Sequence, residues 1–399
     1  MFNKFKFKYN IFFLFCLFPF LSIIQIKTDS QPNALLFGLI LFIINYNKFK
    51  LPKYYLIIFF IFLIASILYL FSEHNFENTL NYTIYFSLLI IPFVTYISLT
   101  RANGLSFKLF KYSVHFWFFV GLIQLYLYPE FLTFLIMRSS GATLYGRGVG
   151  SLAPEPTYYG TICAFFLVIY IINFTNKKDF KLLLSIFIQI FLFSRSSTII
   201  FIIIISIILY FLLVLFISNI KYLFYFVFIL FLSFIQFFIF IDFWDQTRFF
   251  QIVKILLKNP ILVLNDESIS ERINHTFFPI KSLFDNNGFP HLFGSFKSYI
   301  NINILSNNYP ILLNDSINTD HYKKIMNAYG TVIFDLGFIS ILIPFLFILL
   351  FKPLFSNKYM ILAYILFNLL LLTAISFNNA IILFIIGNLF YINKKKIMF

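Results

Sequence analysis

The residues best able to do chemistry gather in one stretch, 146–160, where glycines, an arginine and a glutamate lead into a long apolar run. Glycines let backbone N–H groups approach an anion closely, and the start of a helix adds the positive end of its dipole, so the stretch could bind a phosphate. Within it, Glu155 lies between Pro154 and Pro156, where an acid can cap the first helical turn or accept a proton. We favour proton transfer, because an ionisable group at the end of such a long apolar run is costly to keep there.

Four arginines are further candidates for binding an anion. Arg147 belongs to the same stretch, and Arg195 lies in the Ser-Arg-Ser-Ser segment 194–197. Arg248 and Arg272 lie in a long polar segment. A guanidinium group can bind two phosphate oxygens at once, which an ammonium group cannot. The alternative is a solvated surface position or, for Arg195, contact with lipid headgroups.

The remaining polar residue types suggest no metal or cofactor. His321 precedes the apolar run 329–351 and could act as a base or donate to a phosphate, whereas His115 inside another run is better explained by packing. No Asp-x-Asp pattern occurs, so the sequence predicts no divalent-metal site. Cys16 and Cys163 lie inside apolar runs, which argues against a disulfide framework or a metal site.

The composition points to a membrane as the solvent for this chain. Its 399 residues are 61% hydrophobic and 11% charged, with a mean hydropathy of +0.90. Apolar runs of about 20 residues, with allowance for shorter buried ones, predict about twelve spanning helices in one all-α polytopic domain, 1–399. The predicted spans are 11–27, 34–47, 54–71, 80–99, 112–128, 157–174, 181–194, 198–217, 222–241, 329–351, 359–376 and 378–393.

Charge distribution predicts the orientation. With both termini in the cytoplasm, every predicted cytoplasmic loop carries lysine or arginine, as the positive-inside rule expects, and nearly all acids face outward. The net charge of +15 is then largely an orientation signal, and no nucleic-acid partner is expected. Two predicted external loops, 129–156 and 242–327, are longer than simple connections, and long loops in compact proteins are usually functional.

Three features resemble the O-antigen polymerase and ligase superfamily, particularly Wzy-type polymerases. The first is the stretch from Arg147 through Glu155 and Tyr158 to Gly160, similar to that family's Arg-x-x-Gly followed by Glu-Pro-Ser/Thr and aromatic residues. The second is the Ser-Arg-Ser turn around Arg195, and the third is the pair of enlarged external loops. Met326 stands where ligases of the superfamily carry histidine, which favours a polymerase.

The resemblance implies a GT-C-like glycosyltransferase of the bacterial inner membrane, acting on its outer face without a metal. It would transfer a growing glycan from undecaprenyl diphosphate to the terminal sugar hydroxyl of an incoming lipid-linked repeat unit, in lipopolysaccharide biosynthesis. The expected partners are this undecaprenyl-diphosphate-linked oligosaccharide, the lipid bilayer and a chain-length regulator protein. The candidate site residues follow: Glu155 and His321 for proton transfer, and Arg147, Arg195, Arg272, Arg248 and Tyr158 for the diphosphate and substrate.

Three alternatives remain open from the sequence. An O-antigen ligase has the same donor chemistry and differs in its acceptor. A flippase or transporter predicts charged residues along a path through the membrane and short loops on both faces, whereas these spans hold almost no charge. A structural or sensing membrane protein predicts external arginines that do not converge.

Overall fold

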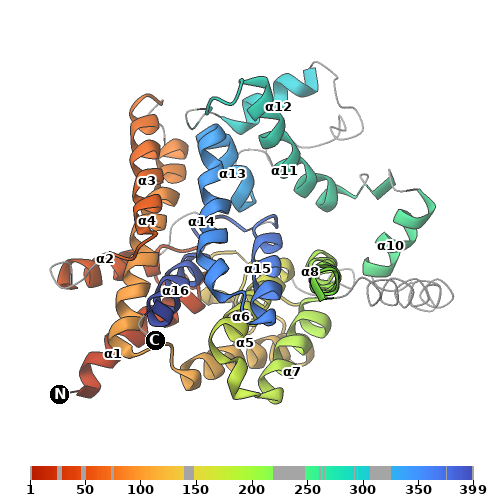
Figure 1. The fold of residues 1–399 in the computed structure, drawn as a ribbon. Coiled ribbons are helices and arrows are strands. Elements are labelled where there is room, and N and C mark those ends of the chain that lie inside the picture. Colours follow the sequence, from red (N-terminus) through yellow and green to blue (C-terminus); the bar gives the residue numbers. More distant parts are fainter. Residues whose placement is uncertain are drawn as a thin grey trace.

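The computed structural model describes residues 2–24, 29–45, 51–72, 76–138, 148–218, 248–259, 262–263, 266–291, 293, 295–305, 325–373 and 375–397. Within these ranges the regular elements are all helices, and β-pairing is limited to an isolated bridge between Leu21 and Ile136. The predicted all-α fold is confirmed at this level. Figure 1 shows the arrangement of the helices.

Helices occupy eleven of the twelve predicted spans, and the remaining one, 222–241, lies outside the described residues. Their bounds are α1 (Phe2–Leu17), α2 (Asn33–Asn45), α3 (Tyr55–Leu70), α4 (Phe76–Ala102), α5 (Phe107–Tyr126), α6 (Pro156–Phe174), α7 (Phe180–Ile188), α8 (Ser197–Ser218), α13 (Ala328–Leu336), α14 (Leu342–Phe351), α15 (Lys358–Leu370) and α16 (Ala380–Ile397). Between α13 and α14, Gly337–Ile341 forms a short 3₁₀ turn.

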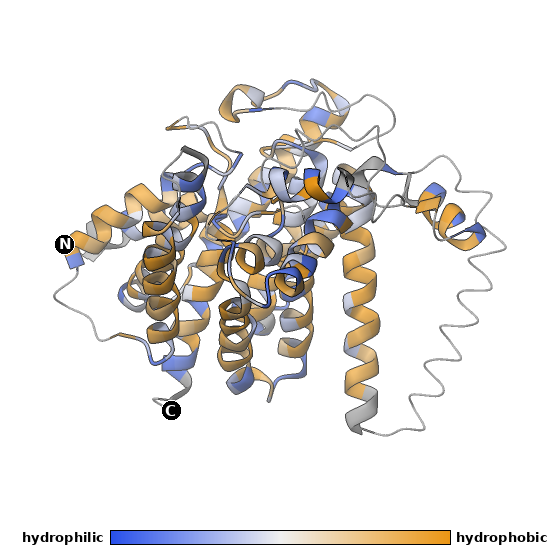
Figure 2. Ribbon diagram, turned by 90° about the horizontal axis from the view of Figure 1, so that it is seen from above, coloured by the Kyte–Doolittle hydropathy of each residue, from blue (hydrophilic) through white to orange (hydrophobic). Residues whose placement is uncertain are grey.

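Four helical segments in the described part are long and apolar enough to cross a membrane: Asn81–Ala102, Pro156–Phe174, Ser197–Val214 and Ala328–Leu354. Several other apolar helices are shorter, including α2, α3 and α15. Hydrophobic residues cover most of the bundle helices along their length (Figure 2). A helical membrane protein is therefore supported, and the full count of spans stays a prediction.

Two helix ends differ from the predicted limits, each for a local reason. The first span was expected to reach residue 27, but α1 ends at Leu17 because Pro19 lacks the N–H that an α-helix needs and restricts the residue before it. The predicted span 181–194 is α-helical only to Ile188 and continues as a π-helix, Gln189–Ser194. Such wide turns are rare and often occur at functional sites.

The predicted loop 242–327 is partly helical. It contains α10 (Arg248–Lys258), α11 (Glu267–Asp285) and α12 (Phe296–Leu305). Asp266 starts α11 by accepting a hydrogen bond from the N–H of Ile269 at 3.1 Å. Phe278 of α11, Phe296 of α12 and Phe334 of α13 share a small apolar core, so α11 and α12 pack against α13 (Figure 1).

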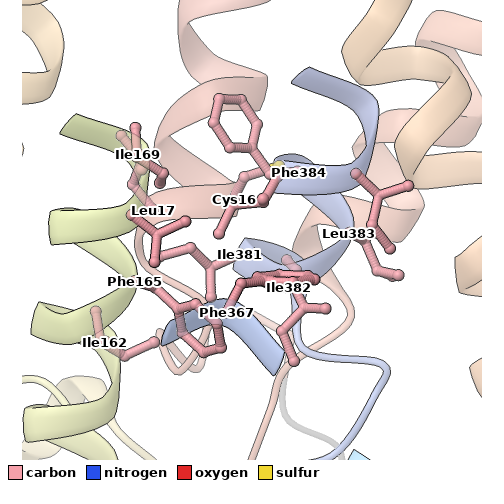
Figure 3. Close-up of a cluster of buried hydrophobic side chains, with 14 of the residues drawn as sticks. Cys16, Leu17, Ile162, Phe165, Ile169, Phe367, Ile381, Ile382, Leu383 and Phe384 are labelled. Atoms are coloured by element: carbon pink, nitrogen blue, oxygen red, sulfur yellow. The ribbon is translucent and has the colours of Figure 1, made fainter. Parts of the chain in front are cut away.

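The main core lies where α1, α6, α15 and α16 meet (Figure 3). Cys16, Phe165, Phe367 and Phe384 are fully buried there, which explains Cys16 as a core residue. On its other side α16 packs closely along α4. Gly387 permits this approach, because a Cβ atom at that position would lie 2.4 Å from the carbonyl oxygen of Pro92.

Candidate functional site

Glu155 occupies the position just before α6. Pro156 is the first helical residue, where the missing N–H costs nothing, and the carbonyl of Glu155 accepts the N–H of Tyr159 at 3.1 Å. The Glu155 side chain does not cap this helix in the described hydrogen bonds. Its Oε1 instead accepts a hydrogen bond from Nη2 of Arg138 at 2.9 Å. This geometry favours a role for the carboxylate beyond starting α6.

Arg138 is shared between two carboxylates. The same Nη2 atom also donates to Oδ2 of Asp29 at 3.1 Å. Partial burial acts to lower the pKa of Arg138, but the carboxylates of Asp29 and Glu155 outweigh it and the pKa is raised. The side chains of Arg138, Glu155 and Asp29 retain 55%, 37% and 31% of their surface. The group is therefore charged, partly exposed and open to a ligand.

The segment that follows α1 helps to position Asp29 and Arg138. Leu21 pairs with Ile136, and the N–H and hydroxyl of Ser22 both donate to the carbonyl of Leu135, at 2.8 and 2.9 Å. Arg138 follows two residues after this bridge. On the other side Asn379, just before α16, donates to the hydroxyl of Ser30 next to Asp29. Asp29 and Arg138 are thus fixed by contacts between distant parts of the chain.

Tyr158 and Arg272 complete the arrangement on the first turn of α6. Arg272 of α11 donates from Nη2 to the hydroxyl of Thr157 at 3.4 Å, across 115 residues of sequence. The ring of Tyr158 packs edge to face on Phe20 at 5.6 Å. Four charged side chains act on the Tyr158 hydroxyl: Asp29, Glu155, Arg138 and Arg272. We call Asp29, Arg138, Glu155, Tyr158 and Arg272 the Glu155 cluster.

The glycine-containing loop that leads to Glu155 is buried and hydrogen-bonded. Val149, Ser151, Leu152 and Ala153 are each at most 1% exposed. The hydroxyl of Ser151 donates to the carbonyl of Trp117, and Gln124 donates to the carbonyl of Ser151 at 2.9 Å. Held in this way on α5, the loop presents Glu155 from a rigid support.

The turn that carries Arg195 packs on this loop, although its side chain does not join the cluster. The N–H of Val149 donates to the carbonyl of Phe193 at 2.9 Å, and a Cβ atom on Gly148 would lie 2.3 Å from the carbonyl oxygen of Ser194. Arg195 has a φ of 47° and is exposed. Its Nε donates to the carbonyl of Leu192 at 3.1 Å, and the described side chains show no hydrogen bond or ion pair between Arg195 and Glu155.

Three other predicted site residues are placed only partly or not at all. Arg147 and His321 lie outside the described residues, so their predicted roles stay predictions. Arg248 begins α10, and only its backbone is described. Of the predicted residues, the structure therefore brings together Glu155, Tyr158 and Arg272.

Two members of the cluster were missed by sequence reasoning. Arg138 lies in the same predicted loop as Glu155, and Asp29 is the acid of the first predicted external loop. Both residues lie in predicted external loops, but the sequence does not indicate that these two loops meet; the bridge between Leu21 and Ile136 brings them together.

The arrangement offers two kinds of chemistry side by side. Two guanidinium groups, on Arg138 and Arg272, can bind and neutralise an oxyanion. The Glu155 carboxylate can accept a proton from a hydroxyl group held next to that oxyanion. Comparison with protein-family models, with curated proteins and with solved structures gives no match to this chain.

Proposed function

We propose that this chain is a polysaccharide polymerase of a bacterial inner membrane, with the Glu155 cluster as its active site on the outer face. The donor is a glycan on a long-chain polyprenyl diphosphate, undecaprenyl diphosphate in the family it resembles. The acceptor is the terminal sugar hydroxyl of a second lipid-linked repeat unit. No metal takes part in the proposed reaction.

The observation that carries the proposal is the convergence of Glu155 with two arginines drawn from separate parts of the chain. Arg138 contacts Glu155 directly, and Arg272 reaches the adjacent Thr157 from α11. The Glu155 carboxylate thereby lies beside positive charge from two distant segments, which is the arrangement that departure of a diphosphate next to a general base needs.

The proposed transfer is a displacement at the anomeric carbon of the donor. The acceptor oxygen forms the new glycosidic bond while the bond from the anomeric carbon to the diphosphate oxygen breaks. The acceptor proton passes to Glu155, and the bonding electron pair leaves with the lipid diphosphate. Arg138 and Arg272 stabilise the negative charge that develops on this leaving group.

The ion pair between Arg138 and Glu155 fits this scheme as a resting arrangement. An incoming diphosphate competes with Glu155 and Asp29 for the Arg138 guanidinium, since all three are anions. Binding of the donor would then release the Glu155 carboxylate next to the acceptor. The hydroxyl of Tyr158 can donate a hydrogen bond to a phosphate oxygen of the lipid-linked glycan.

The test is to delete the gene in its own host and resolve the surface polysaccharide by size. Complementation uses the wild type, Glu155→Gln and, as a matched control, Glu130→Gln, which changes an exposed acid earlier in the same predicted loop. We expect single repeat units on the acceptor after deletion, and a full ladder with the wild type and the control only.

Two other outcomes would reject the proposal. Full-length polymer that accumulates on its lipid carrier would identify a ligase. Repeat units that remain unpolymerised on the cytoplasmic face would identify a flippase.

A further inference from the structure

An apolar groove lies between α1 and α5. Its volume is about 450 Å³. The lining includes Leu14, Phe15, Phe18, Leu21, Tyr112 and Phe116. Leu14, Tyr112 and Phe116 are exposed, so the groove is accessible from the surroundings of the helices.

A stack of aromatic rings connects one end of the groove to the first turn of α6, the helix that begins next to Glu155. Phe18 stacks on Trp117, with ring centroids 5.8 Å apart and planes 8° apart. Trp117 in turn stacks on Tyr159, at 5.7 Å and 14°, in the first turn of α6. A single ring, that of Trp117, therefore separates the end of the groove from the helix turn that follows Glu155.

A second connection runs through the backbone. Leu21 lines the groove and also forms the bridge to Ile136, two residues before Arg138. Phe20, between Phe18 and Leu21, packs on Tyr158 of the cluster. The segment 18–21 thus borders the apolar groove with some of its side chains and the charged cluster with another.

We infer that the groove binds the hydrocarbon chain of a lipid diphosphate whose head group is bound by the Glu155 cluster. The identity of this ligand rests on the proposed function. A lipid diphosphate needs cations at one end and an apolar surface directly beyond them, because neither part is stable in the environment of the other. From Ile11 to Phe18 the α1 side of the groove spans about 10 Å, so it holds the part of the chain next to the diphosphate.

A larger apolar cavity elsewhere serves as the control. It has a volume of about 550 Å³ between α6, α7, α8 and α15, with Leu183, Phe187 and Leu362 in its lining. Tyr170 and Ile171 place it near the far end of α6, about 22 Å along the helix from Glu155. Its lining is also mostly apolar and includes no residue of the Glu155 cluster.

The first experiment is photocrosslinking of the full chain in liposomes. Phe116 and Phe187 are each replaced by photoreactive benzoylphenylalanine, and the probe is a tritiated long-chain polyprenyl diphosphate. We expect labelling at position 116 but not at 187, and competition by unlabelled polyprenyl diphosphate but not by phosphatidylglycerol. Equal labelling at both positions, no labelling, or equal competition by phosphatidylglycerol would overturn the inference.

The second experiment fills the groove. Leu14→Trp adds bulk inside it, and Leu183→Trp makes the same change in the control cavity. We expect Leu14→Trp to raise the KM for a long-chain donor about tenfold, which corresponds to about 1.4 kcal/mol of binding free energy. The KM for a short-chain donor should stay unchanged. Equal effects on both donors, or an equal effect of Leu183→Trp, would contradict the assignment.

The two experiments separate this inference from the proposed function. Selective labelling at position 116 without any glycan transfer by the wild type would reject the polymerase and keep the lipid site. Transfer by the wild type without selective labelling would reject the lipid site alone.

Discussion

Glu155→Gln separates a catalytic role for this residue from a structural one, because the two roles predict effects of very different size. Glutamine keeps the shape of the side chain and one oxygen that can accept from Arg138, but it loses the negative charge and the ability to take a proton. In the structure the ion pair is partly exposed, with 55% of the Arg138 side chain and 37% of the Glu155 side chain accessible.

The structural cost follows from this exposure. Exposed ion pairs contribute about 0.2–1 kcal/mol, so the free energy of unfolding should fall by no more than about 1 kcal/mol. Loss of a general base, in contrast, slows a reaction by about 10²–10⁴-fold. That range corresponds to about 2.7–5.4 kcal/mol in the activation free energy. The expected effect on rate thus exceeds the expected effect on stability severalfold.

The assay measures both quantities on the same purified protein. Initial rates of glycan transfer from a lipid-linked donor are measured in liposomes, and thermal unfolding is followed in detergent. We expect Glu155→Gln to lose at least about a hundredfold in kcat with nearly unchanged unfolding, and Glu130→Gln to match the wild type in both. A Glu155→Gln variant that keeps a third of the wild-type rate would refute the proton-transfer role.

Three further predictions address other parts of the site and fold. Arg272→Gln should raise the KM for the lipid-linked donor about tenfold, and Arg272→Lys should have an intermediate effect because an ammonium group binds fewer phosphate oxygens. An unchanged KM would show that Arg272 does not bind the donor. The control is Arg101→Gln, in the last turn of α4. Gly148→Ala should lower the free energy of unfolding by about 1–3 kcal/mol, because its Cβ would overlap the carbonyl oxygens of Phe193 and Ser194. The control is Gly38→Ala, whose Cβ would make only ordinary van der Waals contacts, so its thermal unfolding should match that of the wild type. The hydrogen bond from Lys111 is the main cause that lowers the pKa of Asp179, so this carboxylate stabilises the fold above its unfolded pKa of about 3.9 and the contribution is lost as the pH falls below that value. Asp179→Asn should therefore be less stable than the wild type at pH 7, and the difference in thermal unfolding should shrink as the pH falls below the usual aspartate range; a difference that stays constant with pH would contradict this reasoning.

The sequence was most informative where a single physical constraint acts locally. Pro154 and Pro156 predicted the start of α6, and the helix begins at Pro156. Glu155 was recognised because an acid at that boundary is costly, and it lies in a charged cluster. Both inferences depend on residues next to each other in the chain, so one sequence suffices for them.

Contacts between distant segments were not predictable in the same way. Within the described residues the partner of Glu155 is Arg138, placed by the bridge between Leu21 and Ile136, while the predicted role of Arg147 stays a prediction. Nothing in the spacing of these residues indicates that pairing. The helices inside 242–327 were missed although a signal existed, since apolar residues recur at helical spacing in 248–258 and Asp266 has the residue type of a helix cap.

The distribution of the cluster along the chain also sets an order for its assembly during synthesis. Asp29, Arg138 and Glu155 are all made before residue 160, and their ion pairs join only segments from that part of the chain. Arg272 is translated more than a hundred residues later, after α8. Because a chain emerges from its N-terminal end, we expect the carboxylates to be neutralised by Arg138 first, with the second guanidinium arriving on a half-site that is already in place. A nascent chain arrested before α11 would then contain the base but lack half of the anion-binding charge.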